Sequence, residues 1–291
     1  MRKAARKAPL EATLPISMHM PVLTFPSPTP TIGLHKALEL AALFGAEVFV
    51  SLVTIRVPGL ASPPVNFGLD IEALAAKAEA TSQREADNAA EDLKREAHRL
   101  KLAIKTDRIR TRAEFVGREM ALEARQHDFC IFSTGGTSEE SVVAEALIFD
   151  AGRPVVLVPS SGDIALQLDT VAVAWDGSRA AARALHDSLP LLRLANRVVV
   201  LTAEKDKQID PRSVEGVLAL LDRHEIDCQH FDVLIMGDKP IGTALQEAAL
   251  RKAAALLVMG GYGHSRLREF VLGGATRSVL ENLRLPTLMS H

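Results

Sequence analysis

An internal repeat constrains the fold of this chain more than any other feature. Residues 129–136 (FCIFSTGG) are similar to residues 255–261 (ALLVMGG), and residues 153–159 (RPVVLVP) are similar to residues 285–291 (LPTLMSH). Self-similarity over such a distance indicates two copies of one folding unit rather than a single irregular domain. The break between the copies falls where Pro, Ser and Gly gather, in residues 159–168 (PSSGDIALQL).

Each copy shows apolar strand-like runs that alternate with amphipathic segments. The expected strands are 20–25, 47–54, 103–110, 129–134 and 154–158, then 170–175, 197–202, 228–235, 255–260 and 286–290. The expected helices include 34–44, 71–100, 180–192, 214–224 and 243–253. Strands that alternate with helices favour a parallel sheet with right-handed crossovers and helices on both faces. The predicted fold class is α/β, with two tandem Rossmann-like domains.

Composition limits the kinds of protein that this chain can be. Its 291 residues are 47% hydrophobic and carry a formal net charge of −2, which describes a globular protein and gives no support for nucleic-acid binding. No apolar run approaches the roughly 18 residues of a membrane span, and the basic start (MRKAARKAPL) lacks the apolar region of a secretory signal. We expect Cys130 and Cys228 to be buried, reduced thiols, which fits the cytoplasm.

The last part of the chain is rich in glycine at a place where a strand should give way to a helix. A short apolar run ends at Met259, and an amphipathic segment follows over residues 275–283. The glycines between them are Gly260, Gly261, Gly263, Gly273 and Gly274. A turn of this kind can present backbone N–H groups to an anion, aided by the helix dipole. Its spacing, G-x2-G-x9-G, is neither the Rossmann nor the Walker pattern.

This spacing resembles the nucleotide loop of the universal stress protein (UspA) family, G-x2-G-x9-G-[ST]. The repeat resembles the tandem form of that family, with a degenerate domain over residues 17–160 and a domain that keeps the loop over residues 168–291. The resemblance implies an adenine nucleotide alpha hydrolase-like fold, with five parallel strands per domain in the order 3-2-1-4-5. It also implies an internal pseudo-dimer that pairs residues 154–158 with residues 286–290. Further association of whole chains into a homodimer is compatible with the sequence but cannot be read from it.

The second half opens with a strand that ends Ala174-Trp175-Asp176-Gly177-Ser178, similar to the D-G-S opening of the family. In the family this aspartate contacts the adenosine of ATP. Asp176 could instead serve as a turn or helix-capping acid, with Ser178 as the competing cap. The resemblance implies ATP, accompanied by Mg²⁺, as the ligand. The expected binding residues are Ala174, Asp176, Met259, Gly260, Gly263, His264, Gly273, Gly274 and Ala275.

Two departures from the family pattern bear on binding in the second half. Gly274 stands where the family has Ser or Thr, so one hydroxyl hydrogen bond to phosphate is lost, which costs about 1 kcal/mol. Thr276 and Ser278 follow one turn later and offer substitute hydroxyls. The basic residues of the loop are either a phosphate-binding group or a solvated surface; they are His264, Arg266 and Arg268.

The first half has lost the family's site. Pro26, in FPSPTP, stands at the place that we assign to Asp176 and supplies neither a carboxylate nor an N–H group. The connection after its fourth strand is shorter, and Glu139 and Glu140 within it should repel a polyphosphate. We therefore expect nucleotide only in the second half.

Other patterns of catalysis or metal binding are weak. The histidines and cysteines lack metal-ligand spacing, and no nucleophile elbow or Walker lysine is present, so we expect neither a metal site nor catalytic residues. Slow ATP hydrolysis by water that reaches a bound phosphate stays open. Two functions follow from this. One is a cytoplasmic stress-response factor that uses ATP as a non-catalytic switch. The other is a nucleotide-free protective or protein-interaction module.

Overall fold

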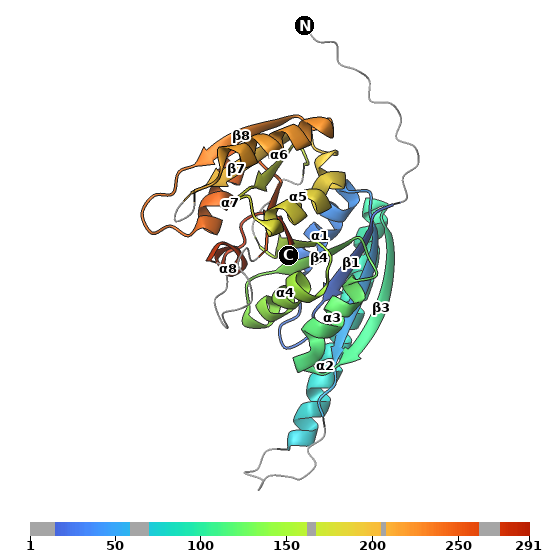
Figure 1. Ribbon diagram of the computed structural model, residues 1–291. Coiled ribbons are helices and arrows are strands. Elements are labelled where there is room, and N and C mark those ends of the chain that lie inside the picture. Colours follow the sequence, from blue (N-terminus) through green and yellow to red (C-terminus); the bar gives the residue numbers. More distant parts are fainter. Residues whose placement is uncertain (1–14, 59–69, 162–166, 205–207, 262–273) are drawn as a thin grey trace.

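A single ten-stranded sheet runs through the whole molecule (Figure 1). The structure is a computed structural model, and it describes residues 15–58, 70–161, 167–204, 208–261 and 274–291. The strand order is β3-β2-β1-β4-β5-β10-β9-β6-β7-β8. The expected α/β fold class is confirmed, and each half shows the order 3-2-1-4-5 that the family resemblance implied.

The elements alternate along the chain in the expected way. The strands are β1 (Ser17–Val22), β2 (Glu47–Ile55), β3 (Ala103–Thr111), β4 (Phe129–Thr134), β5 (Val155–Pro159), β6 (Thr170–Ala174), β7 (Arg197–Ala203), β8 (Cys228–Val233), β9 (Leu256–Gly260) and β10 (Thr287–Ser290). The helices are α1 (Thr31–Leu43), α2 (Ile71–Leu100), α3 (Val116–Ala124), α4 (Ser138–Asp150), α5 (Arg179–Leu192), α6 (Pro211–Arg223), α7 (Ile241–Arg251) and α8 (Gly274–Glu281), with a short 3₁₀ turn at Ala113–Phe115.

The two halves join through their last strands. β5 and β10 pair antiparallel, with Val156 opposite Leu288, whereas all other neighbouring strands pair parallel. The expected pairing of residues 154–158 with residues 286–290 is therefore confirmed. Because each of these strands covers the open edge of the other, neither half leaves that edge exposed. The domain bounds 17–160 and 168–291, and the homodimer, stay predictions.

Two apolar layers, one on each face of the sheet, hold the molecule together. One layer includes Leu38 of α1, Leu93 of α2, Leu185 of α5 and Leu221 of α6. The other layer is formed with α3, α4, α7 and α8 and includes Met120, Leu147, Leu245 and Val279. Both layers extend across the seam, so the halves share one continuous core.

The sheet register corrects the alignment of the two halves near their first strands. Met18 lies beside Phe129 and Val171 lies beside Leu256, which makes Met18 the equivalent of Val171. Leu23, and not Pro26, is therefore the equivalent of Asp176. The first strand also starts at Ser17 instead of residue 20. The alignment was wrong because the β1–α1 connection, residues 23–30, is longer than its counterpart and rich in proline.

The glycine pairs of the two halves are not equivalent either. The Cys130 N–H donates to the Pro154 carbonyl, and the Leu257 N–H donates to the Pro286 carbonyl. If these bonds are matched, Thr134 corresponds to Gly261, and Gly135 lies beyond the end of the shared pattern.

No helix in the described parts of the chain is both long and apolar enough to cross a membrane.

Candidate functional site

The candidate site of the second half lies where β6 and β9 end side by side. Val173 lies opposite Val258 in the register of these two parallel strands. The next residues, Ala174 and Met259, are 8% and 3% exposed, and their side chains belong to the core. The carboxyl ends of β6 and β9 meet at the point where the strand order of this half reverses. This is the usual ligand position in open α/β sheets.

Asp176 forms the turn that leads from β6 into α5. Its Oδ1 accepts a hydrogen bond from the Ser178 N–H at 2.9 Å, and Gly177 between them has a φ of +71°. Ser178 is the N-cap of α5, because its Oγ accepts from the Ala181 N–H at 3.1 Å. Both alternatives from the sequence are thus present: Asp176 builds the turn, and Ser178 caps the helix. The turn keeps an exposed carboxylate at the sheet edge.

Gly260 has a packing role that the sequence did not reveal. A Cβ atom on Gly260 would lie 2.5 Å from the Ala181 nitrogen and 2.6 Å from the Ala180 carbonyl carbon. Both neighbours are backbone atoms that cannot move aside. The N-terminus of α5 therefore approaches the end of β9 more closely than any other residue would allow.

The sequence also places the start of α8 among the expected binding residues. Gly274 and Ala275 are its first two residues, and a Cβ atom on Gly274 would have open space around it. The Ser278 hydroxyl donates to the Ala275 carbonyl at 3.0 Å, so it is engaged within the helix. The remaining expected loop residues, Gly263, His264, Gly273, Arg266 and Arg268, lie outside the described residues.

In the first half, the connection between β4 and α4 corresponds to the connection between β9 and α8, and it holds a carboxylate of its own. Glu140 is 4% exposed, and its Oε2 accepts from the Gly135 N–H at 2.9 Å and the Thr137 N–H at 3.1 Å. Thr137 in turn caps α4 by accepting from the Glu140 N–H at 3.3 Å. Glu140 is therefore turned inward onto the N–H groups that an anion would need. The Thr-x-x-Glu capping-box pattern was the signal that would have revealed this.

A buried polar cluster between β1, β2 and β4 was also missed. His19 Nε2 lies 2.9 Å from Ser51 Oγ, and His19 Nδ1 lies 3.9 Å from Cys130 Sγ. The ring of His127 stacks on that of His19, with 5.6 Å between centroids. Burial, and secondarily the nearby His127, lowers the pKa of His19 to about 3.

The same burial raises the pKa of the Cys130 thiol, so Cys130 stays protonated and is a poor nucleophile. Cys130 is buried and Cys228 is partly buried, and both are free thiols. Among the described residues, no group of three His, Cys, Asp or Glu side chains is placed to hold a metal ion.

Comparison with known proteins places this geometry in a known fold. No protein-family model and no curated protein matches the sequence. A universal stress protein from Archaeoglobus fulgidus DSM 4304 matches in structure with a TM-score of 0.69 at 15% identity, over 94% of this chain and 97% of that one. A putative universal stress protein from Pseudomonas aeruginosa UCBPP-PA14 matches with a TM-score of 0.55 at 14% identity, over 94% and 92%. The chain therefore has the fold of the universal stress proteins over nearly its whole length, as the repeat and the glycine spacing implied.

Proposed function

We propose that the second half binds an adenine nucleotide at the carboxyl ends of β6 and β9, and that the bound nucleotide acts as a non-catalytic switch. ATP is the proposed nucleotide, with Mg²⁺ beside its phosphates. The observation that carries the proposal is the Asp176 turn, which holds an exposed carboxylate at this edge. A ribose or adenine can donate to such a carboxylate, while the N-terminus of α8 favours the phosphates.

The asymmetry between the halves supports one site per chain. In the first half the equivalent of Asp176 is the apolar Leu23, and the Glu140 carboxylate already accepts from the Gly135 and Thr137 N–H groups. An incoming phosphate would have to displace that carboxylate and would meet its charge. Nucleotide is therefore proposed for the second half alone.

The packing of α8 suggests how occupancy could be transmitted. Gly136 in the first half lies against the end of α8, where a Cβ atom would be 3.5 Å from the carbonyl oxygens of Leu280 and Glu281. A ligand at Gly274 and Ala275 would contact the start of the same short helix. Small shifts of α8 would then reach the first half, and such coupling is what a switch requires.

Calorimetric titration of the full chain with ATP and Mg²⁺ tests the proposal. Gly263→Asp should weaken binding by more than about tenfold, because it places a carboxylate in the loop expected to receive phosphate. Gly274→Ser should strengthen binding by up to about 1 kcal/mol. Gly216→Asp is the matched control, because its Cβ would have open space on α6. Equal affinity in wild type and Gly263→Asp, or nucleotide beside Gly135, would reject the assignment.

The second candidate function is a nucleotide-free protective or protein-interaction module. Gly274 favours it, because no side-chain hydroxyl is present at the first position of α8. Mass spectrometry of the purified protein separates the two functions. Adenine nucleotide that copurifies at close to one equivalent supports the switch, whereas the absence of both copurification and calorimetric binding supports the module.

A further inference from the structure

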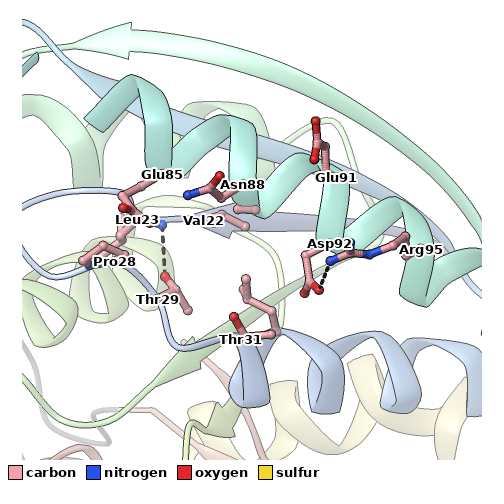
Figure 2. Close-up of a pocket in the computed structure, with 12 residues that line it drawn as sticks. Val22, Leu23, Pro28, Thr29, Thr31, Glu85, Asn88, Glu91, Asp92 and Arg95 are labelled. Carbon is pink, nitrogen blue, oxygen red and sulfur yellow. Dashed lines mark hydrogen bonds and ion pairs between the residues drawn. The ribbon is translucent and has the colours of Figure 1, made fainter. Parts of the chain in front are cut away.

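A cavity of about 390 Å³ opens in the first half between α1, α2 and the end of β1 (Figure 2). Its size is within the range of small-molecule sites. The lining residues are Val22, Leu23, Pro28, Thr29, Thr31, Leu34, Glu85, Asn88, Ala89, Glu91, Asp92 and Arg95. None of them belongs to the proposed nucleotide site, which lies in the other half.

The two halves differ in the size of a side chain that lines the cavity. Val22 is the equivalent of Trp175 in the corrected register, and both side chains face the layer that holds α1, α2, α5 and α6. In the second half the Trp175 indole reaches α6, where its Nε1 donates to Ser213 Oγ at 3.0 Å. Val22 is too short to reach α2 in the same way. The small side chain leaves room that the larger one takes up.

The floor of the cavity is apolar and its shape is held by the β1–α1 connection. Val22 and Leu34 are 1% and 2% exposed, and both belong to the core. The Thr29 hydroxyl accepts from the Leu23 N–H at 3.1 Å, and the Thr29 N–H donates to the Leu23 carbonyl at 2.9 Å. These two bonds close the connection on itself and keep Pro28 and Thr29 at the rim.

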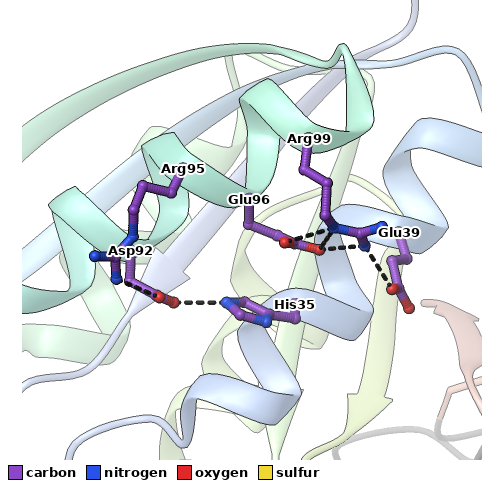
Figure 3. A network of polar contacts seen from close by, with 6 residues as sticks. All are labelled: His35, Glu39, Asp92, Arg95, Glu96 and Arg99. Carbon is purple, nitrogen blue, oxygen red and sulfur yellow. Dashed lines mark hydrogen bonds and ion pairs between the residues drawn. The ribbon is translucent and has the colours of Figure 1, made fainter.

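A polar network fixes the two helical walls relative to each other (Figure 3). Asp92 of α2 pairs with His35 of α1 at 2.6 Å and with Arg95 at 3.0 Å. One turn later, Arg99 of α2 contacts both Glu96 and Glu39, the latter on α1 at 3.0 Å. Burial opposes ionisation of Asp92, but the hydrogen bonds from Arg95 and His35 outweigh it and lower the pKa of this carboxyl group. Asp92 is therefore ionised, and its negative charge is already balanced within this network.

Glu85 is the remaining ionic group that faces the cavity. It is partly buried and lines the cavity, and it has no ion-pair partner among the described residues. Glu91, by contrast, extends away from α1 in Figure 2. Asn88 lies one turn after Glu85 and offers both a donor and an acceptor. One uncompensated carboxylate above an apolar floor attracts a cation that carries a small hydrophobic group.

We propose that this cavity binds a small organic amine. Its ammonium group donates to Glu85 and Asn88, and its apolar part lies against Ala89 and Pro28, above the buried Val22 and Leu34. The site is separate from the proposed nucleotide site, because the second half contributes none of the lining residues.

Three probes that share a phenyl ring and differ in charge test which charge the cavity selects. 2-Phenylethylamine, 2-phenylethanol and 3-phenylpropionate are titrated into the full chain, with amide chemical shifts of Asn88 and Ala89 as the site-specific readout. The amine should bind at least about tenfold more tightly than the alcohol, as expected for one charge-assisted hydrogen bond, and the carboxylate should not bind. A higher salt concentration should weaken the binding of the amine. Equal binding of the three probes, or no shift with the amine, would overturn the proposal.

Two variants locate the site and its charge. Val22→Trp copies the second half, fills the cavity and should abolish amine binding. Glu85→Gln keeps the shape, removes the charge and should weaken the amine about tenfold while leaving the alcohol unchanged. Glu72→Gln, on the exposed first turn of the same helix, is the matched control and should have no effect. If Val22→Trp does not fold, Glu85→Gln still decides the question. Unchanged amine affinity in that variant would reject the site.

Discussion

Gly260 at the end of β9 lies directly under Ala181 of α5, so close that a Cβ atom on the glycine would be 2.5 Å from the Ala181 nitrogen. The first half makes the same contact between helix and strand, but there the glycine belongs to the helix and the larger residue to the strand. Ser133 of β4 is the equivalent of Gly260, and Gly33, like Ala181 the third residue of its helix, faces the Ser133 hydroxyl. One glycine per half permits the approach of helix and strand, but it comes from the strand in one half and from the helix in the other.

Gly260→Ala should destabilise the chain by about 2 kcal/mol or more, because the new methyl group meets backbone atoms of α5. Urea unfolding measures the effect. Gly216→Ala is the matched control, since its Cβ would have open space within α6 and should raise stability by about 0.5–1 kcal/mol. If Gly260→Ala costs no more than a few tenths of a kcal/mol, β9 and α5 do not approach as described. If Gly260→Ala is destabilising as expected, a loss of nucleotide binding in Gly260 variants is not evidence that Gly260 contacts phosphate directly.

The exchange predicts a favourable coupling between Gly33 and Ser133. Gly33→Ala alone should destabilise, because its methyl group meets the Ser133 hydroxyl and lies 2.9 Å from Ser160 Cα. Ser133→Gly in the same chain should recover part of that loss and so reproduce the arrangement of the second half. A double-mutant cycle should give a coupling of about 1 kcal/mol or more. Additive effects would show that the two residues do not share this contact.

Periodicity was enough to predict the fold, but only strand register could align the two halves. The repeated apolar strands gave the α/β class, and the family resemblance gave the strand order and the pairing of β5 with β10. The match of Pro26 to Asp176 failed because both first strands are apolar on both faces, so their pattern does not fix an alignment, and because the β1–α1 connection is longer than its counterpart. Only hydrogen bonds between neighbouring strands identify Leu23 as the equivalent.

The chemistry of the first half was harder to predict because it depends on side-chain direction. Glu140 was expected to repel an anion, yet it replaces one, and its charge alone does not distinguish these outcomes. His19, Ser51 and Cys130 are distant in sequence and meet only through the pairing of β1 with β2 and β4. Their equivalents in the second half are Ala172, Leu201 and Leu257, all buried and apolar.

Glu140→Ala should turn the α4 N-terminus into an anion site. The variant leaves the Gly135 and Thr137 N–H groups without the carboxylate, which should cost about 1–3 kcal/mol of stability. Added phosphate should restore part of that loss in a concentration-dependent way, since it binds only the folded chain. Glu139→Ala, which removes the neighbouring exposed charge, is the control and should show no such rescue. If phosphate stabilises both variants equally, the N–H groups of this turn are not the anion site.

His19 should make the chain sensitive to acid at a pH where carboxylates are still ionised. In the unfolded chain His19 takes up a proton near its ordinary pKa of 6.5, whereas the folded chain resists protonation until the pH approaches about 3. Between these values the unfolded state binds one more proton, so stability falls as the pH falls, by about 1.4 kcal/mol per pH unit. The contribution is complete above pH 6.5 and is lost progressively below it. Urea unfolding between about pH 5 and pH 7 lies above the range in which most carboxylates titrate. Burial also lowers the pKa of the neighbouring His127, so His127 contributes to the slope in the same sense. His19→Gln should flatten the slope over this window, and His98→Gln, which alters an exposed histidine of α2, should leave it unchanged. The same slope in wild type and His19→Gln would mean that another group carries the acid sensitivity.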